Sequence, residues 1–311
     1  MAVGASVSVE VELVLDAKAS TGECPTWSER EGVLYWTDIE EPALHRFDPR
    51  GGDDRVWPMP AQMSAFALCR SGRVLVALRT GLAVLDPASG ALRSLAPPPY
   101  DPRTHRFNDG KCDREGRFWV GVMRKPLPGT EREGEDGPER GHPARPLHVF
   151  DAAAGLAPVD AYAVIGNGLA WSPDHRTLYF TDTEAGEVRC FDFDAGAGAI
   201  ANPRVLARFA PEEGRPDGAA VDTEGGYWCA LYGGGRLVRL DPVDGRVERE
   251  IALPVSQPTM CAFGGPGLDT LDITSASDGL DPEARAREPL AGGLFRCRPG
   301  FRGMPVDLFA D

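Results

Sequence analysis

The sequence predicts an all-β protein, a six-bladed β-propeller with four-stranded antiparallel blades. One strand-rich unit recurs six times along the 311 residues, at a spacing of roughly 40 to 50 residues that is typical of propeller blades. Each copy joins a turn, a short apolar strand, a second turn and a further strand, and most of these second strands end in Asp or Asp-Pro. The copies begin with GVLYWTDIEEPALHRFDP at Gly32, GRVLVALRTGLAVLDP at Gly72, GRFWVGVM (followed by RPLHVFD) at Gly116, HRTLYFTDTEAGEVRCFDFD at His175, GGYWCALYGGGRLVRLDP at Gly225 and LDTLDITSA (followed by GGLFRCRPG) at Leu268.

The segment before the first copy predicts one more strand. Apolar residues alternate with other residues from Val7 to Leu15, which is typical of a half-buried strand. We expect this strand to complete the last blade and close the ring, because closure removes two exposed sheet edges. Since no single copy buries its own apolar face, residues 1–311 are predicted to form one domain.

The third copy is interrupted by residues 124–146. This segment is rich in charged residues, Gly and Pro, a composition that buries little apolar surface. We therefore expect a solvated hairpin insertion. The alternative is a lid over one mouth of the channel, because long loops in compact domains are often functional.

Charge and cysteine usage narrow the class of protein. The formal net charge is −14, with the acidic residues dispersed along the chain, which argues against a nucleic-acid partner. No apolar run is long enough to predict a membrane span, and the N-terminus lacks the pattern of a secretory signal. An odd number of cysteines without a CxxC pair indicates a reducing cytoplasm. We expect a monomer or a weak homodimer.

A residue with an oxygen-bearing side chain recurs at one position of the repeat. Small residues and then an apolar strand follow it. In a propeller such positions face one another across the channel, so Glu23, Asn108, Asn167 and Asp217 are expected to converge. Carboxylate and amide oxygens suit Ca²⁺, Mg²⁺ or Mn²⁺ and tolerate Zn²⁺, and two ionised carboxylates in one channel repel each other without a cation. The alternative is that these are ordinary turn residues. The full register reads Glu23, Ser64, Asn108, Asn167, Asp217, and either Thr259 or Met260.

Arg106 lies two residues before Asn108, on the same face of an extended strand. Its guanidinium is predicted to reach a carbonyl or hydroxyl group of a bound ligand. The alternative is a surface arginine that pairs with Asp101 or Asp113.

The neighbours of Asn108 are predicted to have structural roles. By strand alternation, Asp109 and Lys111 point away from the face that carries Asn108. His105 is expected to be an ordinary loop histidine.

The strings GECPTW, RFNDGK, GRFWVGVM, GNGLAWSPD, TLYFTD, PDGAAVDTEGGYW, PTMCAFGG and LDITSA resemble the gluconolactonase/regucalcin (senescence marker protein) family nearly from end to end. The resemblance implies a six-bladed propeller that binds one divalent metal ion in its channel and hydrolyses sugar lactones. It also implies that Glu23, Asn167 and Asp217 are the metal ligands, that Arg106 and Asn108 contact the substrate, and that Asp217 is the catalytic acid and base.

The chain departs from the family pattern in the third copy. Val122 stands where the family often has Thr, and Arg124, Lys125 and Pro126 occupy the segment in which some members carry a substrate-binding glutamate. These departures affect the expected substrate more than the expected reaction.

The predicted function is therefore a metal-dependent hydrolase that opens an aldonolactone ring to the aldonic acid. Ca²⁺ and Zn²⁺ are the foremost candidates for the cofactor, and Mn²⁺, Mg²⁺ and Fe²⁺ remain open. Two alternatives stay open as well, because propellers host many unrelated functions. They are a non-catalytic binding propeller stabilised by a metal ion, and a metal-dependent esterase or phosphotriesterase.

Overall fold

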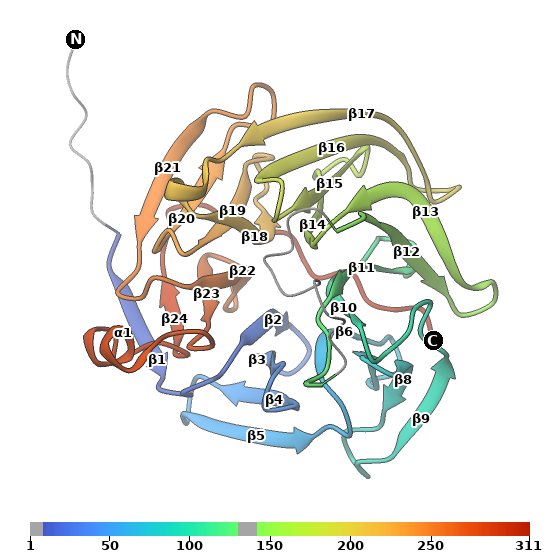
Figure 1. Cartoon of the computed structure of the whole chain (residues 1–311), viewed down its shortest axis with the longest axis horizontal. Helices are drawn as coiled ribbons and strands as arrows, with labels where there is room; N and C mark the ends of the chain where they lie inside the picture. Colours follow the sequence, from blue (N-terminus) through green and yellow to red (C-terminus); the bar gives the residue numbers. More distant parts are fainter. Residues whose placement is uncertain (1–8, 130–141) are drawn as a thin grey trace.

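The computed structural model describes residues 9–129 and 142–311, and six four-stranded antiparallel sheets form the blades of a ring (Figure 1). The blades are numbered here in chain order, and the strands of blades 1 to 5 follow the sequence from the centre outwards. Blade 1 contains β2 (Gly22–Ser28), β3 (Val33–Asp38), β4 (Ala43–Asp48) and β5 (Asp53–Pro58). Blade 2 contains β6 (Met63–Leu68), β7 (Val74–Leu78), β8 (Gly81–Leu85) and β9 (Leu92–Ala96). Blade 3 contains β10 (His105–Cys112), β11 (Phe118–Arg124), β12 (Arg145–Asp151) and β13 (Gly155–Ala163).

The second half of the chain repeats this arrangement. Blade 4 contains β14 (Gly166–Trp171), β15 (Thr177–Asp182), β16 (Glu187–Asp194) and β17 (Ala199–Arg208). Blade 5 contains β18 (Arg215–Val221), β19 (Tyr227–Tyr232), β20 (Arg236–Leu240) and β21 (Val247–Ala252). Blade 6 contains β22 (Pro258–Gly264), β23 (Thr270–Ser275), β24 (Leu294–Cys297) and, outermost, β1 (Val11–Leu15). The predicted fold class is confirmed.

The N-terminal strand closes the ring as the alternation of its apolar residues predicts. β1 pairs antiparallel with β24, with Val11 opposite Cys297 and Leu13 opposite Phe295. One blade therefore combines strands from both ends of the chain (Figure 1). This pairing covers the edge of β24, which would otherwise expose unpaired backbone groups.

Burial decreases from the inner to the outer strands. All six residues of β6 and of β14 are buried, because each inner strand is covered by neighbouring blades on both faces. These two strands consist almost entirely of apolar or small residues, as is typical of strands buried on both faces. In the outermost β21, by contrast, only Ile251 is buried. The hydrophobic clusters combine residues of adjacent blades, and Trp36, Trp119 and Trp228 are among the largest fully buried side chains. The core thus lies between the blades.

Each inner strand contains a bulge at the same register. Pairing with the second strand of the blade shifts between Glu23 and Thr26, Met63 and Ala65, Phe107 and Gly110, Asn167 and Ala170, Pro216 and Ala219, and Pro258 and Met260. A bulge places one extra residue in a strand and redirects the side chains around it. The sixth bulge contains Thr259, so Thr259 rather than Met260 occupies the register in blade 6.

Helical structure is confined to two short elements within the described ranges. These are the 3₁₀ helix η1 (Pro211–Glu213) and the α-helix α1 (Pro282–Arg287), where the side chain of Asp281 caps the first turn by accepting a hydrogen bond from the Ala284 N–H at 2.7 Å. None of the described helices is long and apolar enough to cross a membrane.

The segment that interrupts the third repeat, residues 124–146, connects β11 to β12 (Figure 1). Most of its residues, 130–141, lie outside the described residues, as do residues 1–8. The hairpin and lid interpretations of residues 124–146, and the assignment of residues 1–311 to one domain, therefore stay predictions.

Candidate active site

The recurring bulges bring the predicted site residues together in the N-terminal halves of four inner strands. β2 carries Glu23, β10 carries Arg106 and Asn108, β14 carries Asn167, and β18 carries Asp217. None of these five side chains is more than 8% exposed. Because polar groups are rarely buried without partners, this cluster is the strongest candidate for a functional site.

Asn167 and Asp217 contact each other directly. The Asn167 Nδ2 group donates one hydrogen bond to Asp217 Oδ1 and another to Thr183 Oγ1, the latter at 3.0 Å. Thr183 in turn donates to the Pro216 carbonyl at 2.8 Å. With both amide protons used in this way, the carbonyl oxygen of Asn167 is left to bind a ligand. Thr183 lies outside the repeated register, so the sequence analysis missed it.

Arg106 and Asn108 form a second pair. Arg106 Nη1 donates to Asn108 Oδ1 at 2.6 Å and to the Phe107 carbonyl at 2.9 Å, and Asn108 Nδ2 donates to the Gly166 carbonyl at 3.1 Å. The Arg106 Nε atom is buried and has no hydrogen-bond partner among the described residues. An unused donor on a buried guanidinium is a group that a bound substrate oxygen would satisfy.

The alternative role for Arg106, a surface ion pair, is wrong. Asp101 pairs with Arg103 at 2.7 Å, and Asp113 pairs with Arg117 at the same distance. Both carboxylates are thus occupied by other arginines, while Arg106 is buried.

The environment of Glu23 and Asp217 opposes the ionisation of both carboxyl groups. Burial, followed by the negative charge of Asp109, raises the pKa of Glu23 to about 8. Burial, followed by the charge of Glu23, raises the pKa of Asp217 well above its ordinary value. Arg106 lowers the pKa of both carboxyl groups, but does not offset burial. A second positive charge between them would therefore be strongly stabilised.

These residues fit a divalent cation by the chemistry of their donors. Glu23 and Asp217 supply carboxylate oxygens and Asn167 supplies an amide oxygen, all hard ligands. In the part of the chain that the structure describes, no three His, Cys, Asp or Glu side chains form a metal-binding group by themselves. The amide of Asn167 is therefore needed to complete a three-residue donor set.

Asp109 lies in the site, and the prediction that it points away is wrong. Its side chain is buried, and Oδ2 accepts a hydrogen bond from the Leu169 N–H of the neighbouring blade at 2.9 Å. Its negative charge also raises the pKa of both Glu23 and Asp217. The physical reason is the bulge between Phe107 and Gly110, which breaks the alternation on which the prediction relied.

His105 also differs from its prediction. It is the first residue of β10 rather than a loop residue, and it is buried. Burial, aided by the positive charges of Arg145 and Arg124, lowers the pKa of its imidazole to about 4. A neutral histidine is therefore expected at physiological pH.

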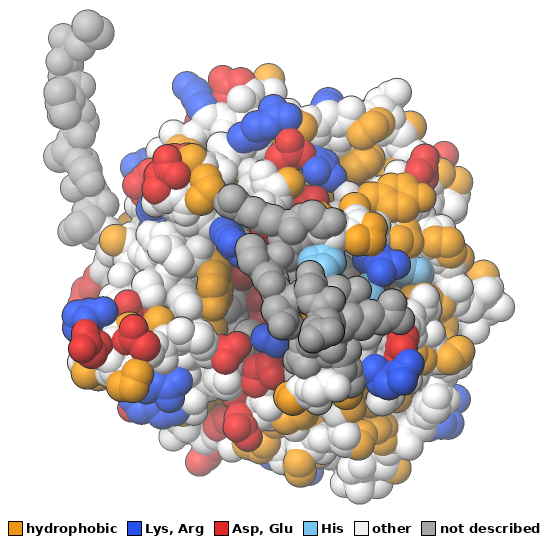
Figure 2. Space-filling view, viewed as in Figure 1, with side chains coloured by type: hydrophobic (Ala, Val, Ile, Leu, Met, Phe, Trp, Pro, Cys, Tyr) orange, Lys and Arg blue, Asp and Glu red, His pale blue; other side chains and the backbone are white. Residues whose placement is uncertain are grey.

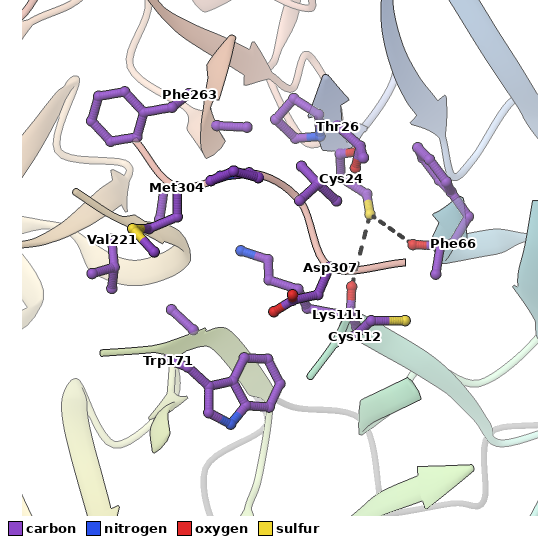
Figure 3. Close-up of a pocket in the computed structure, with 18 of the residues that line it drawn as sticks. Cys24, Thr26, Phe66, Lys111, Cys112, Trp171, Val221, Phe263, Met304 and Asp307 are labelled. Atoms are coloured by element: carbon purple, nitrogen blue, oxygen red, sulfur yellow. Dashed lines mark hydrogen bonds between the residues drawn. The ribbon is translucent and has the colours of Figure 1, made fainter. Parts of the chain in front are cut away.

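A separate cavity occupies the other end of the channel (Figure 3). It has a volume of about 320 Å³ and is lined by the C-terminal halves of the inner strands, including Lys111 and Phe263. The chain near the C-terminus contributes Met304 and Asp307 to its wall. This segment crosses that end of the ring, where Gly303 pairs with Asp222 and Phe309 with Cys69, whereas the five-residue cluster lies towards the opposite mouth.

That opposite mouth carries mixed charge. Lys125, which follows β11, lies 3.7 Å from a carboxylate oxygen of Glu40 in blade 1 and 3.6 Å from one of Asp278 in blade 6. Acidic and basic side chains also lie side by side near the centre of the face seen in Figure 2. Mixed charge of this kind suits a polar ligand better than an apolar one.

The fold and the site together define a class of protein, a six-bladed propeller with a buried acidic and amide cluster in its channel. Residues 21–277 match the family described as SMP-30/Gluconolactonase/LRE-like region, and the chain belongs to this family. The resemblance identified in the repeated motifs is thereby confirmed.

Individual relatives align over almost the whole chain. Regucalcin from Gallus gallus is 36% identical over 304 residues, which cover 97% of this chain and 99% of the relative. A 6-deoxy-6-sulfogluconolactonase from Pseudomonas putida is 40% identical over 290 residues, covering 93% of this chain and 94% of the relative. Among solved structures, a calcium-binding protein, regucalcin, from Agrobacterium tumefaciens has a TM-score of 0.88 at 27% identity and covers 98% of both chains.

Proposed function

We propose that this protein is a metal-dependent lactonase that hydrolyses a sugar lactone to the corresponding aldonic acid. The observation that carries the proposal is the burial of Glu23, Asn167 and Asp217 beside Arg106 and Asn108 in one channel. A relative that is 40% identical is a 6-deoxy-6-sulfogluconolactonase, which supports a lactone as the substrate.

Glu23, Asn167 and Asp217 would hold the cation through their oxygen atoms. A bound divalent cation supplies Lewis-acid polarisation of the lactone carbonyl and stabilises the negative charge that develops on its oxygen. Beside such a cation, Glu23 and Asp217, whose pKa values are raised by burial first, would be favoured in their ionised forms. The regucalcin from Agrobacterium tumefaciens is described as calcium-binding, which supports Ca²⁺; Zn²⁺, Mn²⁺, Mg²⁺ and Fe²⁺ are the other candidates.

Arg106 and Asn108 orient the substrate. The Nε–H of Arg106, which has no partner among the described residues, would donate to a ring or hydroxyl oxygen of the lactone. Asn108 is held by Arg106 and by the Gly166 carbonyl, so its side chain is fixed before the substrate arrives. Such preorganisation lowers the entropic part of the barrier.

Asp217 transfers the proton. As a general base it takes a proton from water while the water oxygen forms a bond to the carbonyl carbon. It then returns that proton to the ring oxygen as the C–O bond of the lactone breaks. The products are one carboxylic acid and one hydroxyl group, so the atoms of lactone and water are all accounted for.

The proposal also covers the cellular compartment, the oligomeric state and the partners of the protein. All seven cysteines, Cys24, Cys69, Cys112, Cys190, Cys229, Cys261 and Cys297, are unpaired and buried. Free thiols support a reducing cytoplasm. We propose a monomer or a weak homodimer that acts on a small-molecule lactone and has no nucleic-acid or membrane partner.

The decisive experiment combines elemental analysis of the purified protein with acid release from a panel of aldonolactones, before and after chelation. We expect a bound divalent metal and turnover that disappears with the chelator and returns with added metal. Turnover that survives complete removal of metal would overturn the mechanism. A metal-dependent rise in Tm without turnover on any lactone would favour a non-catalytic propeller, and turnover confined to aryl esters or phosphotriesters would change the substrate class.

A further inference from the structure

We propose that Asp109 is a positioning residue of this site, which holds the bulge that presents Asn167 and adds a third buried negative charge beside the cation. The inference rests on the proposed function, because the role of Asn167 that it explains is the binding of that cation. It assigns a role to a residue that lies outside the repeated register of Glu23, Asn167 and Asp217.

The first support is a contact between blades. Asp109 in β10 accepts a hydrogen bond from the Leu169 N–H at 2.9 Å, and Leu169 lies two residues after Asn167 in the bulge of β14. Burial raises the pKa of Asp109, whereas the charge of Lys111 and the backbone N–H groups of Leu169, Gly110 and Gly168 favour its ionised form. One carboxylate thus anchors the backbone that carries Asn167.

The bulge is held from the other side as well. Gly168 has a left-handed backbone conformation, with φ of 58°, and its carbonyl accepts a hydrogen bond from the hydroxyl of Tyr227 in blade 5 at 2.8 Å. Asp109 and Tyr227 therefore hold the two ends of one peptide group, that between Gly168 and Leu169, from two neighbouring blades. Because Asn167 comes directly before Gly168, the placement of this peptide constrains where the side-chain amide of Asn167 points.

The second support is an unsatisfied atom. The Asp109 side chain is only 4% exposed, yet its Oδ1 atom is buried without a hydrogen-bond partner among the described residues. An unpaired buried acceptor is unfavourable, particularly on a carboxylate. The charge of Lys111 favours the ionised form of Asp109, but the hydrogen bond of its ammonium group goes to the Ala219 carbonyl at 2.8 Å.

A buried aspartate in the same blade shows what a purely structural carboxylate looks like. Asp113 is fully buried, and its Oδ1 accepts from the backbone of Glu115 and Arg117. Its Oδ2 accepts from Arg117 Nε at 2.7 Å and from Trp119 Nε1 at 2.9 Å. Both oxygens of Asp113 have hydrogen-bond partners, whereas Oδ1 of Asp109 is buried without one among the described residues.

The test compares Asp109→Asn, Asp109→Ala and the control Asp113→Asn by calorimetric titration of the metal-free full chain with Ca²⁺ and with Mn²⁺. Loss of groups that orient metal ligands typically lowers metal affinity by about 10 to 100-fold. We expect Asp109→Asn, which keeps an oxygen for the Leu169 N–H but loses the charge, to weaken binding by about 10-fold, and Asp109→Ala to weaken it further. Asp113→Asn should lower Tm and leave the Kd for the cation unchanged.

A second readout separates positioning from general stability. If Asp109 acts through the cation, raising the Ca²⁺ or Mn²⁺ concentration should restore most of the kcat of Asp109→Asn. Wild-type Kd values in both Asp109 variants would overturn the inference and leave the proposed function intact. A wild-type protein that binds neither Ca²⁺ nor Mn²⁺, and binds none of Zn²⁺, Mg²⁺ and Fe²⁺ in the same titration, would overturn both. If Asp109→Ala does not fold, Asp109→Asn decides alone.

Discussion

The side-chain amide of Asn167 donates a hydrogen bond to Asp217 Oδ1, which links the inner strands of blades 4 and 5. The two residues are 50 positions apart in the sequence and occupy the same register of their repeats. The bond orients the amide of Asn167 so that its oxygen is available to a ligand. It also gives the carboxylate of Asp217, to which we assign the proton transfer, a hydrogen-bond donor.

Replacing Asp217 should remove the general base while preserving the shape of the site. We expect Asp217→Asn to lower kcat by about 10² to 10⁴-fold, the usual contribution of a positioned acid or base. Acid release from glucono-lactone at saturating metal measures the effect. Asp222→Asn is the matched control, since Asp222 is a buried carboxylate of the same blade that pairs with Arg239 at 2.7 Å. The control should lower Tm and retain kcat; equal losses of kcat in both variants would refute the assignment.

Arg106 should not be replaceable by lysine. Lysine keeps the positive charge but loses the planar group that donates to both Asn108 and Phe107. We expect Arg106→Lys to raise KM by about 10-fold or more and to lower kcat as well. Steady-state kinetics on a lactone measure both quantities, and the exposed Arg103→Lys provides the control. An unchanged KM in Arg106→Lys would exclude substrate contact by this residue.

Glu23 should make the stability of the metal-free protein depend on pH. Burial, together with the charge of Asp109, raises its pKa from 4.5 to about 8, so the folded state binds this proton more tightly than the unfolded state does. The stabilisation is complete below the unfolded pKa and is lost as pH rises through the folded value. We expect Glu23→Gln to gain about 5 °C in Tm relative to wild type between pH 5 and pH 8.

The same variant tests the role of Glu23 in metal binding. With saturating Ca²⁺, the wild-type protein should gain Tm and Glu23→Gln should gain little, because the carboxylate that binds the ion is gone. Parallel Tm curves for the two metal-free proteins would show that Glu23 does not titrate in this range. Equal metal-induced gains would show that it is not a ligand.

Gly168 should be the glycine least tolerant of substitution near the site. A Cβ atom at Gly168 would collide with the Tyr227 hydroxyl and with Thr181, in addition to the strain of its left-handed backbone. We expect Gly168→Ala to destabilise the fold by several kcal/mol, judged as about 1 to 2 kcal/mol of backbone strain plus overpacking of about 1 to 3 kcal/mol. It should also weaken metal binding, because Asn167 precedes the displaced peptide.

Gly32→Ala is the control that isolates the backbone contribution. Gly32 has a similar φ of 66°, but nothing lies within 4 Å of the added Cβ. We expect a loss of about 1 to 2 kcal/mol in the free energy of unfolding and no change in metal affinity. Chemical denaturation measures both variants, and equal losses would contradict the packing argument.

The sequence by itself determined the architecture and most of the site. Strand-forming residues and turns are local features, and their sixfold repetition leaves little alternative to a closed ring of blades. Because every blade places its bulge at the same position, the residues at that position could be read from the chain as Glu23, Asn108, Asn167 and Asp217. Arg106 was found from its two-residue spacing to Asn108, which strand geometry preserves up to the bulge.

The tertiary structure alone decided what surrounds these residues. Strand alternation excluded Asp109 from the site, but the bulge in β10 turns its carboxylate towards Leu169 of the next blade. Thr183 holds Asn167 from outside the repeated register, and the burial of His105 depends on neighbours that follow it by many residues. Hydrogen bonds between blades and the desolvation of charges arise from segments that are distant in sequence, so no local pattern encodes them.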